Sequence, residues 1–149
     1  MAVFRYRMQS ILDLKQQLEE QARMELAAAN AELKEEQDAL KALHDRRTEY
    51  IRKGQQLEGS GFHAVDLREN ANAIRAMDDL IASQLSRVQM AGKKVDRARE
   101  VLQQVMQERK AQEKLREKAF EAFRKEVLAA ESKEADELTG YREGRKRRE

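Results

Sequence analysis

The sequence predicts an all-α protein in which two long helices form an antiparallel coiled-coil hairpin and the second helix overhangs the first. A composition typical of long helices supports this prediction, and so do apolar residues that recur at alternating steps of three and four. A glycine-rich stretch near residue 60 divides the repeat into two parts. Because only a short loop separates the two parts, we expect the helices to be antiparallel neighbours.

The composition argues against a globular core. Of the 149 residues, 39% are charged and only 5% are aromatic, and proline is absent. A chain with so few bulky apolar side chains buries a stripe along a helix instead of a compact interior. A disordered chain of mixed charge is the competing interpretation, and the regular apolar spacing favours the coiled coil.

Charge and residue usage also exclude several classes of function. A net charge of +2 gives no global field that would attract nucleic acid or membrane. The absence of cysteine removes disulfides, thiol catalysis and thiolate metal sites. No apolar run is long enough to span a bilayer, and Met1 to Arg7 contains no signal-peptide core. We therefore expect a cytoplasmic protein.

The first helix is expected over about residues 4–53. Its seam from residue 26 onward consists of Leu26, Ala29, Leu33, Leu40, Leu43 and Tyr50, with Glu36 and Arg47 at polar seam positions. Upstream, apolar residues keep this spacing in a shifted frame, at Phe4, Met8, Ile11 and Leu18. The steps from Leu18 to Ala22 and from Ala22 to Leu26 are both four, a stutter that predicts local unwinding of the supercoil.

The turn is expected over about residues 54–63, and the second helix over about 64–140. Glycine and serine gather in the turn, at Gly54, Gly59, Ser60 and Gly61. The second seam consists of Ile74, Met77, Ile81, Leu85, Val88, Gly92, Val95, Ala98, Leu102 and Val105. A basic tail over 141–149 completes a single hairpin domain of residues 1–149.

The two seams fix a register for the hairpin. The opposed pairs are Leu43 with Met77 or Asp78, Leu40 with Ile81, Leu33 with Val88, and Leu26 with Val95. The same register sets Ala29 against Gly92, and a close approach of the backbones there would explain a glycine in mid-helix. The alternative is that Gly92 is a tolerated surface glycine.

Carried outward, this register leaves part of the second helix without a partner. Phe4 falls opposite Leu115 or Glu117, so we expect no intramolecular partner after Lys118. The apolar stripe nevertheless continues through Phe120, Phe123 and Val127, then Ala130, Leu138 and Tyr141. An apolar stripe without a partner predicts a binding site for another protein.

The aromatic residues lie at the two ends of the predicted hairpin. Phe4, Tyr6, Phe120, Phe123 and Tyr141 belong to the base or the overhang, and Tyr50 and Phe62 to the tip. Aromatic residues contribute much of the binding energy at interfaces, so both ends are candidate contact sites. The alternative is that the rings only seal the helix ends.

No pattern in the sequence predicts catalysis or a bound cofactor. His44 and His63 lack a second ligand at metal-site spacing, and Gly59-Ser60-Gly61 lacks the lysine of a phosphate loop. A two-stranded coil offers no desolvated cleft for paired carboxylates. We expect no catalytic, cofactor, metal or small-molecule site. The basic run from Arg142 to Arg148 suggests phosphate contacts as an alternative to a solvated terminus.

The N-terminal segment carries a resemblance to a known family. Phe4-Arg5-Tyr6-Arg7-Met8-Gln9-Ser10-Ile11-Leu12-Asp13-Leu14 resembles the start of the FliJ family, small coiled-coil components of the flagellar type III export apparatus. The likeness continues through Glu19-Glu20-Gln21-Ala22-Arg23 and Glu25-Leu26-Ala27 and covers nearly the whole chain.

The resemblance implies a stalk-like protein with several partners. They would be the hexameric export ATPase at the hairpin base, the cytoplasmic domain of the membrane export gate, and export chaperones. The implied gate-contacting positions at the tip are Leu43, Tyr50 and Met77. Arg46 and Ala73 stand where some members of the family carry an aromatic residue.

The resemblance thus implies a non-enzymatic export component, peripheral at the inner face of the cell membrane. Its overhang residues Phe120, Phe123 and Val127 would enter the ATPase ring, and its tip would reach the gate. A generic coiled-coil tether is one alternative. A nucleic-acid-associated protein that uses the basic tail is another.

Overall fold

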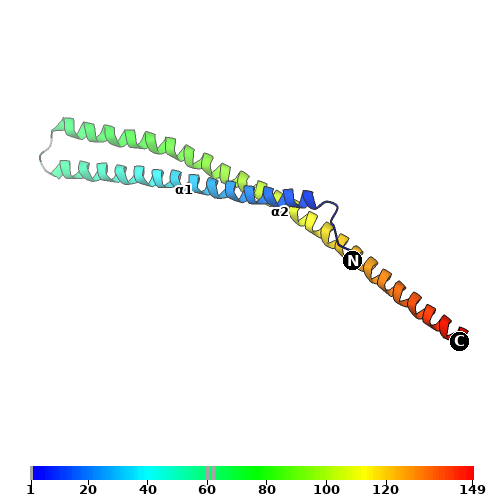
Figure 1. Cartoon of the computed structure of the whole chain (residues 1–149). Helices are drawn as coiled ribbons and strands as arrows, with labels where there is room; N and C mark the ends of the chain where they lie inside the picture. Colours follow the sequence, from blue (N-terminus) through cyan, green and yellow to red (C-terminus); the bar gives the residue numbers. More distant parts are fainter. Residues whose placement is uncertain (1, 60, 62) are drawn as a thin grey trace. The chain divides into compact units, whose positions relative to one another are not determined.

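The computed structural model describes residues 2–59, 61 and 63–149. Over these residues it contains two α-helices and no strand: α1 spans Gln9–Gly59 and α2 spans Ala64–Arg148 (Figure 1). The two helices pack against each other, which confirms the predicted all-α hairpin. Ser60 of the predicted turn and Phe62 of the predicted tip lie outside the described residues.

Contacts group the chain into two compact units. The hairpin unit comprises Gln21–Gln103, and the base unit comprises Met1–Glu20 together with Gln104–Glu149. Each helix contributes to both units. The single domain expected from the sequence stays a prediction, and each unit is described by itself.

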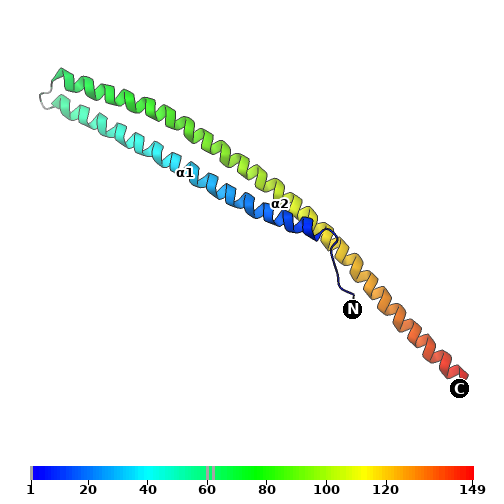
Figure 2. The ribbon, with the colours of Figure 1, turned by 45° about the horizontal axis from the view of Figure 1, so that its top comes forward.

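In the hairpin unit, α1 and α2 run antiparallel and side by side in both views (Figures 1 and 2). Interhelix polar contacts fix their register. The amide nitrogen of Gln84 donates to the backbone oxygen of Glu36 at 2.9 Å, and the Lys94 ammonium lies 2.9 Å from the Glu32 carboxylate. The Gln84–Glu36 contact agrees with the predicted register to within about one residue, whereas Lys94 lies more than one helical turn beyond the residue that this register sets against Glu32.

The seam of α1 has no stutter, contrary to the sequence prediction. Leu12 is 3% exposed and Leu18 is 36% exposed, so the apolar frame proposed upstream does not face α2. Steps of three and four instead continue without interruption from Leu12 to Leu57. Lys15 and Glu19 occupy seam positions in this frame because α2 supplies an oppositely charged partner to each of them.

The seam of α2 also differs at two positions. Gln84 is 8% exposed whereas Leu85 is 44% exposed, so the glutamine occupies the seam. Glu36 satisfies the Gln84 amide, which makes the burial of this polar side chain acceptable. Ala91 is buried, and a Cβ added at Gly92 would meet nothing within 4 Å. The predicted close approach at Gly92 is therefore wrong, and Gly92 is a surface glycine.

The helix boundaries depart from the expected ones for identifiable reasons. α1 begins at Gln9 instead of near residue 4, because Arg5 and Arg7 would place positive charge at the positive end of the helix dipole. It continues past residue 53 to Gly59, and the turn takes its left-handed residue at Gly61, where φ is 68°. α2 extends through the expected tail to Arg148, since basic residues in a last turn complement the dipole.

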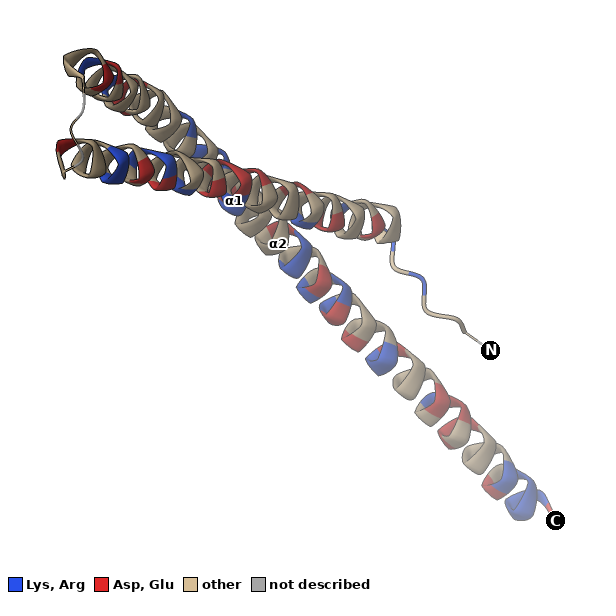
Figure 3. Ribbon diagram, turned by 90° about the vertical axis from the view of Figure 1, so that its left-hand side faces the viewer, with Lys and Arg blue, Asp and Glu red and all other residues tan. Residues whose placement is uncertain are grey.

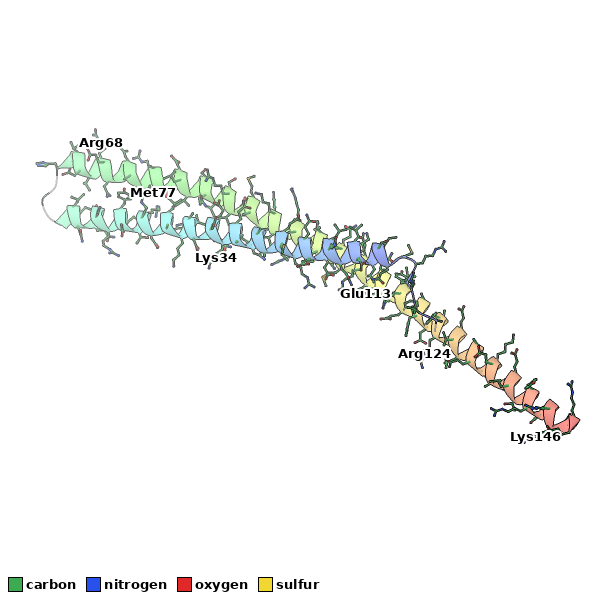
Figure 4. The ribbon with its side chains drawn as sticks, viewed as in Figure 1. Lys34, Arg68, Met77, Glu113, Arg124 and Lys146 are labelled. Carbon is green, nitrogen blue, oxygen red and sulfur yellow. The ribbon has the colours of Figure 1, made fainter. Side chains whose placement is uncertain are left out.

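Charged side chains cover the outer faces of both helices. Figure 3 shows basic and acidic residues interspersed along α1 and α2, with basic residues at the end of α2. Figure 4 shows that Met77 lies on the face of α2 that is turned toward α1, whereas Lys34 points away from α2. The buried stripe and the charged exterior are those of a coiled coil.

Candidate partner-binding surfaces

The base unit contains a polar cluster in the seam between its two helical segments. The Lys15 ammonium lies 2.8 Å from the Glu108 carboxylate. The hydrogen bond and positive charge of Lys15 lower the pKa of the Glu108 carboxyl. Arg109 pairs with Glu113 at 2.9 Å and with the buried carboxylate of Glu19. Its pKa is raised by the hydrogen bond to Glu113, and then by the one to Glu19.

A non-helical segment, residues 2–8, precedes α1, and we call it the N-terminal strap (Figure 2). The Phe4 ring packs edge-on against Phe120, with centroids 5.2 Å apart and an interplanar angle of 78°. It also contacts Phe123, at 5.5 Å between centroids. The Tyr6 hydroxyl donates to the side-chain oxygen of Gln112 at 3.0 Å.

These contacts correct the expectation that α2 has no intramolecular partner after Lys118. The sequence prediction placed Phe4 opposite Leu115 or Glu117 because it assumed a continuous helix. An extended chain advances roughly 3.3 Å per residue, against about 1.5 Å in a helix. Phe4 therefore reaches farther along α2 and contacts Phe120 and Phe123.

The predicted overhang residues Phe120, Phe123 and Val127 form what we call the base stripe. Phe120 is 43% exposed despite its contact with Phe4, and Phe123 and Val127 are half-buried. A groove of about 610 Å³ runs beside the strap and is lined by residues that include Val3, Ala122 and Glu126. Farther along α2, Leu128, Leu138 and Tyr141 are exposed. The base stripe is thus an apolar surface that the strap covers in part.

The tip of the hairpin unit carries a second hollow, which we call the tip groove. Its volume is about 480 Å³, and its lining consists of Tyr50, Lys53, Gln56, Leu57, Asp66, Glu69, Asn70 and Ala73. Tyr50 is half-buried, with the Lys53 ammonium 5.8 Å from its ring centroid. Leu43 is half-buried, and Met77 is only 6% exposed. Tyr50 is thus the only one of the three predicted tip residues that lines the tip groove.

Asn70 joins the two helices at the tip groove. Its amide nitrogen donates to the backbone oxygen of Tyr50 at 2.9 Å. A Cβ on Gly54 would lie 2.6 Å from the Asn70 side-chain oxygen, so the glycine makes room for this amide. Sequence reasoning missed both Asn70 and the strap. The alternation of aromatic and basic residues from Phe4 to Arg7 was the available signal for the strap.

The described residues contain no group of three or more His, Cys, Asp or Glu side chains placed to hold a metal ion. None of the helices in that part of the chain is long and apolar enough to cross a membrane. The apolar side chains that line the tip groove are half-buried, and in the base stripe Phe120 is exposed beside the half-buried Phe123 and Val127. Fold and surfaces together define a coiled-coil protein of the interaction class.

The flagellar FliJ protein family model matches residues 4–148. The chain therefore belongs to the FliJ family, as its N-terminal segment indicated. No curated protein and no solved structure matches the chain. Membership identifies a component of the flagellar export apparatus, in a family of structural, non-enzymatic export proteins.

Proposed function

We propose that this chain couples the export ATPase ring to the membrane export gate without catalysing a reaction itself. The base stripe binds inside the hexameric ATPase. The observation that carries this proposal is Phe120, a large aromatic side chain that stays 43% exposed on a helix whose partner helix has ended. Aromatic residues at partly covered apolar sites are typical binding hot spots.

The tip binds the cytoplasmic domain of the export gate in this proposal. Tyr50 supplies an aromatic ring and Lys53 a positive charge at the tip groove. Leu43 is half-buried and contributes the edge of its side chain, whereas the buried Met77 holds the helices together beneath it. The partner surface is expected to be apolar at its centre, with charged groups of both signs that complement Lys53, Asp66 and Glu69 of the groove lining.

The charged exterior supports the remaining parts of the proposal. Exposed helical faces of mixed charge suit brief contacts with export chaperones, which the protein would escort. Its place would be the cytoplasm, peripheral to the inner face of the cell membrane. No small-molecule substrate and no nucleic acid is part of this function. The basic residues at the end of α2 match the helix dipole, which accounts for them without nucleic acid.

The rival interpretation as a generic tether required an uninterrupted helix through the predicted turn. α1 ends at Gly59 and α2 begins at Ala64, and the two run antiparallel in the hairpin unit. A parallel dimer built along one continuous helix is therefore not supported. Sedimentation of the free protein would measure how many chains associate in solution.

The experiment that tests the ATPase interaction is a double substitution in the base stripe. Phe120→Ala with Phe123→Ala should weaken binding to purified export ATPase by about 2 kcal/mol or more, because two aromatic anchors are lost. Leu128→Ala is the matched control, since Leu128 is exposed on the same helix but outside the stripe. Normal ATPase binding by the double variant would rule out the proposed role of this end.

A further inference from the structure

The N-terminal strap is held on α2 by several independent contacts. Phe4 packs against Phe120 and Phe123, and the Arg116 guanidinium lies 5.6 Å from the Phe4 ring centroid. Arg116 also donates from Nε to the Gln9 side-chain oxygen at 3.1 Å. One arginine thus contacts both the strap and the first residue of α1. This arrangement fixes the point at which the strap leaves the helix.

Within the strap, burial alternates residue by residue from Phe4 to Arg7. Phe4 and Tyr6 are half-buried, whereas Arg5 and Arg7 are exposed. Alternation with a period of two is the pattern of an extended segment that lies along a surface with one face inward. The aromatic side chains face α2 and the basic ones face water. The strap is therefore docked like a bound peptide.

We propose that α2 carries a docking site for an extended aromatic segment, that the chain's own strap is its resident ligand, and that the strap masks the base stripe until a partner displaces it. This inference rests on the proposed function, because the partner that needs the base stripe is the export ATPase. The ligand class is a short segment in which aromatic residues alternate with basic ones. Phe4 fills the part of the site that lies between Phe120 and Phe123.

The contacts between the strap and α2 are weak enough for a partner to displace the strap. Aromatic pairs of this geometry favour the docked state by about tenfold, so a small undocked population is present at equilibrium. A partner that binds only the uncovered base stripe selects that population, and its apparent affinity is lowered by the same factor. Loss of the Phe4 ring should therefore tighten ATPase binding by about tenfold.

A crosslinking experiment on the full chain tests the docking site. The chain contains no cysteine, so Val3→Cys with Glu126→Cys introduces the only thiols, at two residues that line the same groove. A short bismaleimide should give a monomeric crosslinked product, and adding Phe4→Ala should reduce its yield severalfold. Val3→Cys with Glu134→Cys is the matched control, because Glu134 does not line that groove. Equal yields with and without Phe4, or at both positions, would overturn the docked strap.

Binding of purified export ATPase to the same proteins tests the masking. The crosslinked chain, in which the strap cannot leave the base stripe, should lose ATPase binding, and the Phe4→Ala variant should bind about tenfold more tightly than wild type. Equal binding by crosslinked and free protein, or weaker binding by Phe4→Ala, would overturn masking. Failure of the proposed function would give a different result. The Phe120→Ala, Phe123→Ala variant would then bind the ATPase normally, while the crosslink in the chain with an unchanged base stripe would still depend on Phe4.

Discussion

Single glycines in the two helices occupy contrasting surroundings. Gly92 has open space where a Cβ would lie, whereas a Cβ at Gly54 would meet the Asn70 side-chain oxygen at 2.6 Å. The Asn70 amide nitrogen donates to the backbone oxygen of Tyr50, so a shift of this side chain away from residue 54 acts on that hydrogen bond. Two glycines of the same sequence therefore differ in what they contribute to the fold.

Alanine at each position should reveal this difference. Gly92→Ala should raise the free energy of unfolding by about 0.5–1 kcal/mol, the helix-propensity gain of alanine over glycine. Gly54→Ala should show little or no gain, because the lost Asn70 hydrogen bond, worth about 1 kcal/mol, offsets the same propensity term. Urea unfolding followed by circular dichroism measures both. A destabilised Gly92→Ala variant would contradict the open surroundings of that residue.

The Lys15–Glu108 pair gives the base unit a predictable response to acid. Lys15 lowers the pKa of the Glu108 carboxyl in the folded state below its ordinary value of 4.5. The pair therefore contributes stability that is complete above the unfolded-state pKa and is lost as pH falls through the folded-state pKa. Between about pH 5 and about pH 3, wild type should lose more stability than Glu108→Gln.

Salt provides the control for this prediction. Both side chains are partly exposed, so the difference between wild type and variant should be small and should shrink at high ionic strength. Thermal melts across the pH series, with Glu100→Gln as an exposed reference on the same helix, measure it. Parallel pH profiles for wild type and Glu108→Gln would contradict the lowered pKa.

At the scale of the helices, polar seam residues give the coiled coil its register. Glu19 is buried against Arg109, and Gln84 is buried against Glu36. Apolar seam residues tolerate a slip of one heptad, because leucine packs against leucine in either register. A slip of the register would leave Glu19 or Gln84 buried without a partner. The free-energy cost of such a buried polar group far exceeds any gain from apolar packing in the slipped register. The polar pairs therefore select one register.

A double-mutant cycle on Glu19 and Arg109 tests this role. Arg109→Leu alone should lower the melting temperature, because it removes a charged partner of the buried Glu19 carboxylate. Adding Glu19→Leu should restore the melting temperature to the wild-type value or above, since two apolar side chains then meet in the seam. A double variant less stable than Arg109→Leu alone would show that the pair itself, and not the avoidance of a lone charge, stabilises the seam.

The two helices were predictable because composition and periodicity are local properties of the chain. The frame of the seam was harder to predict. Ile11 and Leu18 fit an apolar repeat, yet Leu12, Lys15 and Glu19 occupy the seam because their partners, among them Arg109, lie about ninety residues later. Apolar spacing alone carries no information about such pairs.

The candidate sites were also predictable only where the signal is local in the sequence. The base stripe was visible in the sequence as a continued apolar repeat at Phe120, Phe123 and Val127. Phe4 covers part of the stripe only because the strap is extended. Whether the strap is extended or helical depends on the balance between helix propensity and contacts with residues distant in sequence. Asn70 gave no local signal, because its partner is the backbone of another helix. Tertiary contacts decided each of these features.

At the scale of the whole molecule, the two proposed interaction surfaces belong to different units. The tip groove lies within the hairpin unit, and the base stripe lies within the base unit. Substitutions at sites that share no partner usually act additively. Damage at one surface should therefore leave the other intact.

The final prediction is a crossed binding experiment on these two surfaces. Tyr50→Ala should weaken binding to the cytoplasmic domain of the export gate by about 2 kcal/mol, because it removes the aromatic ring at the tip groove. It should leave ATPase binding unchanged, and Phe120→Ala with Phe123→Ala should give the reverse pattern. Calorimetry with each purified partner measures the four affinities, and helix content by circular dichroism confirms that both variants fold. If Tyr50→Ala weakened both interactions equally, the two partners would share one surface, and a protein that couples ring to gate through separate ends would be excluded.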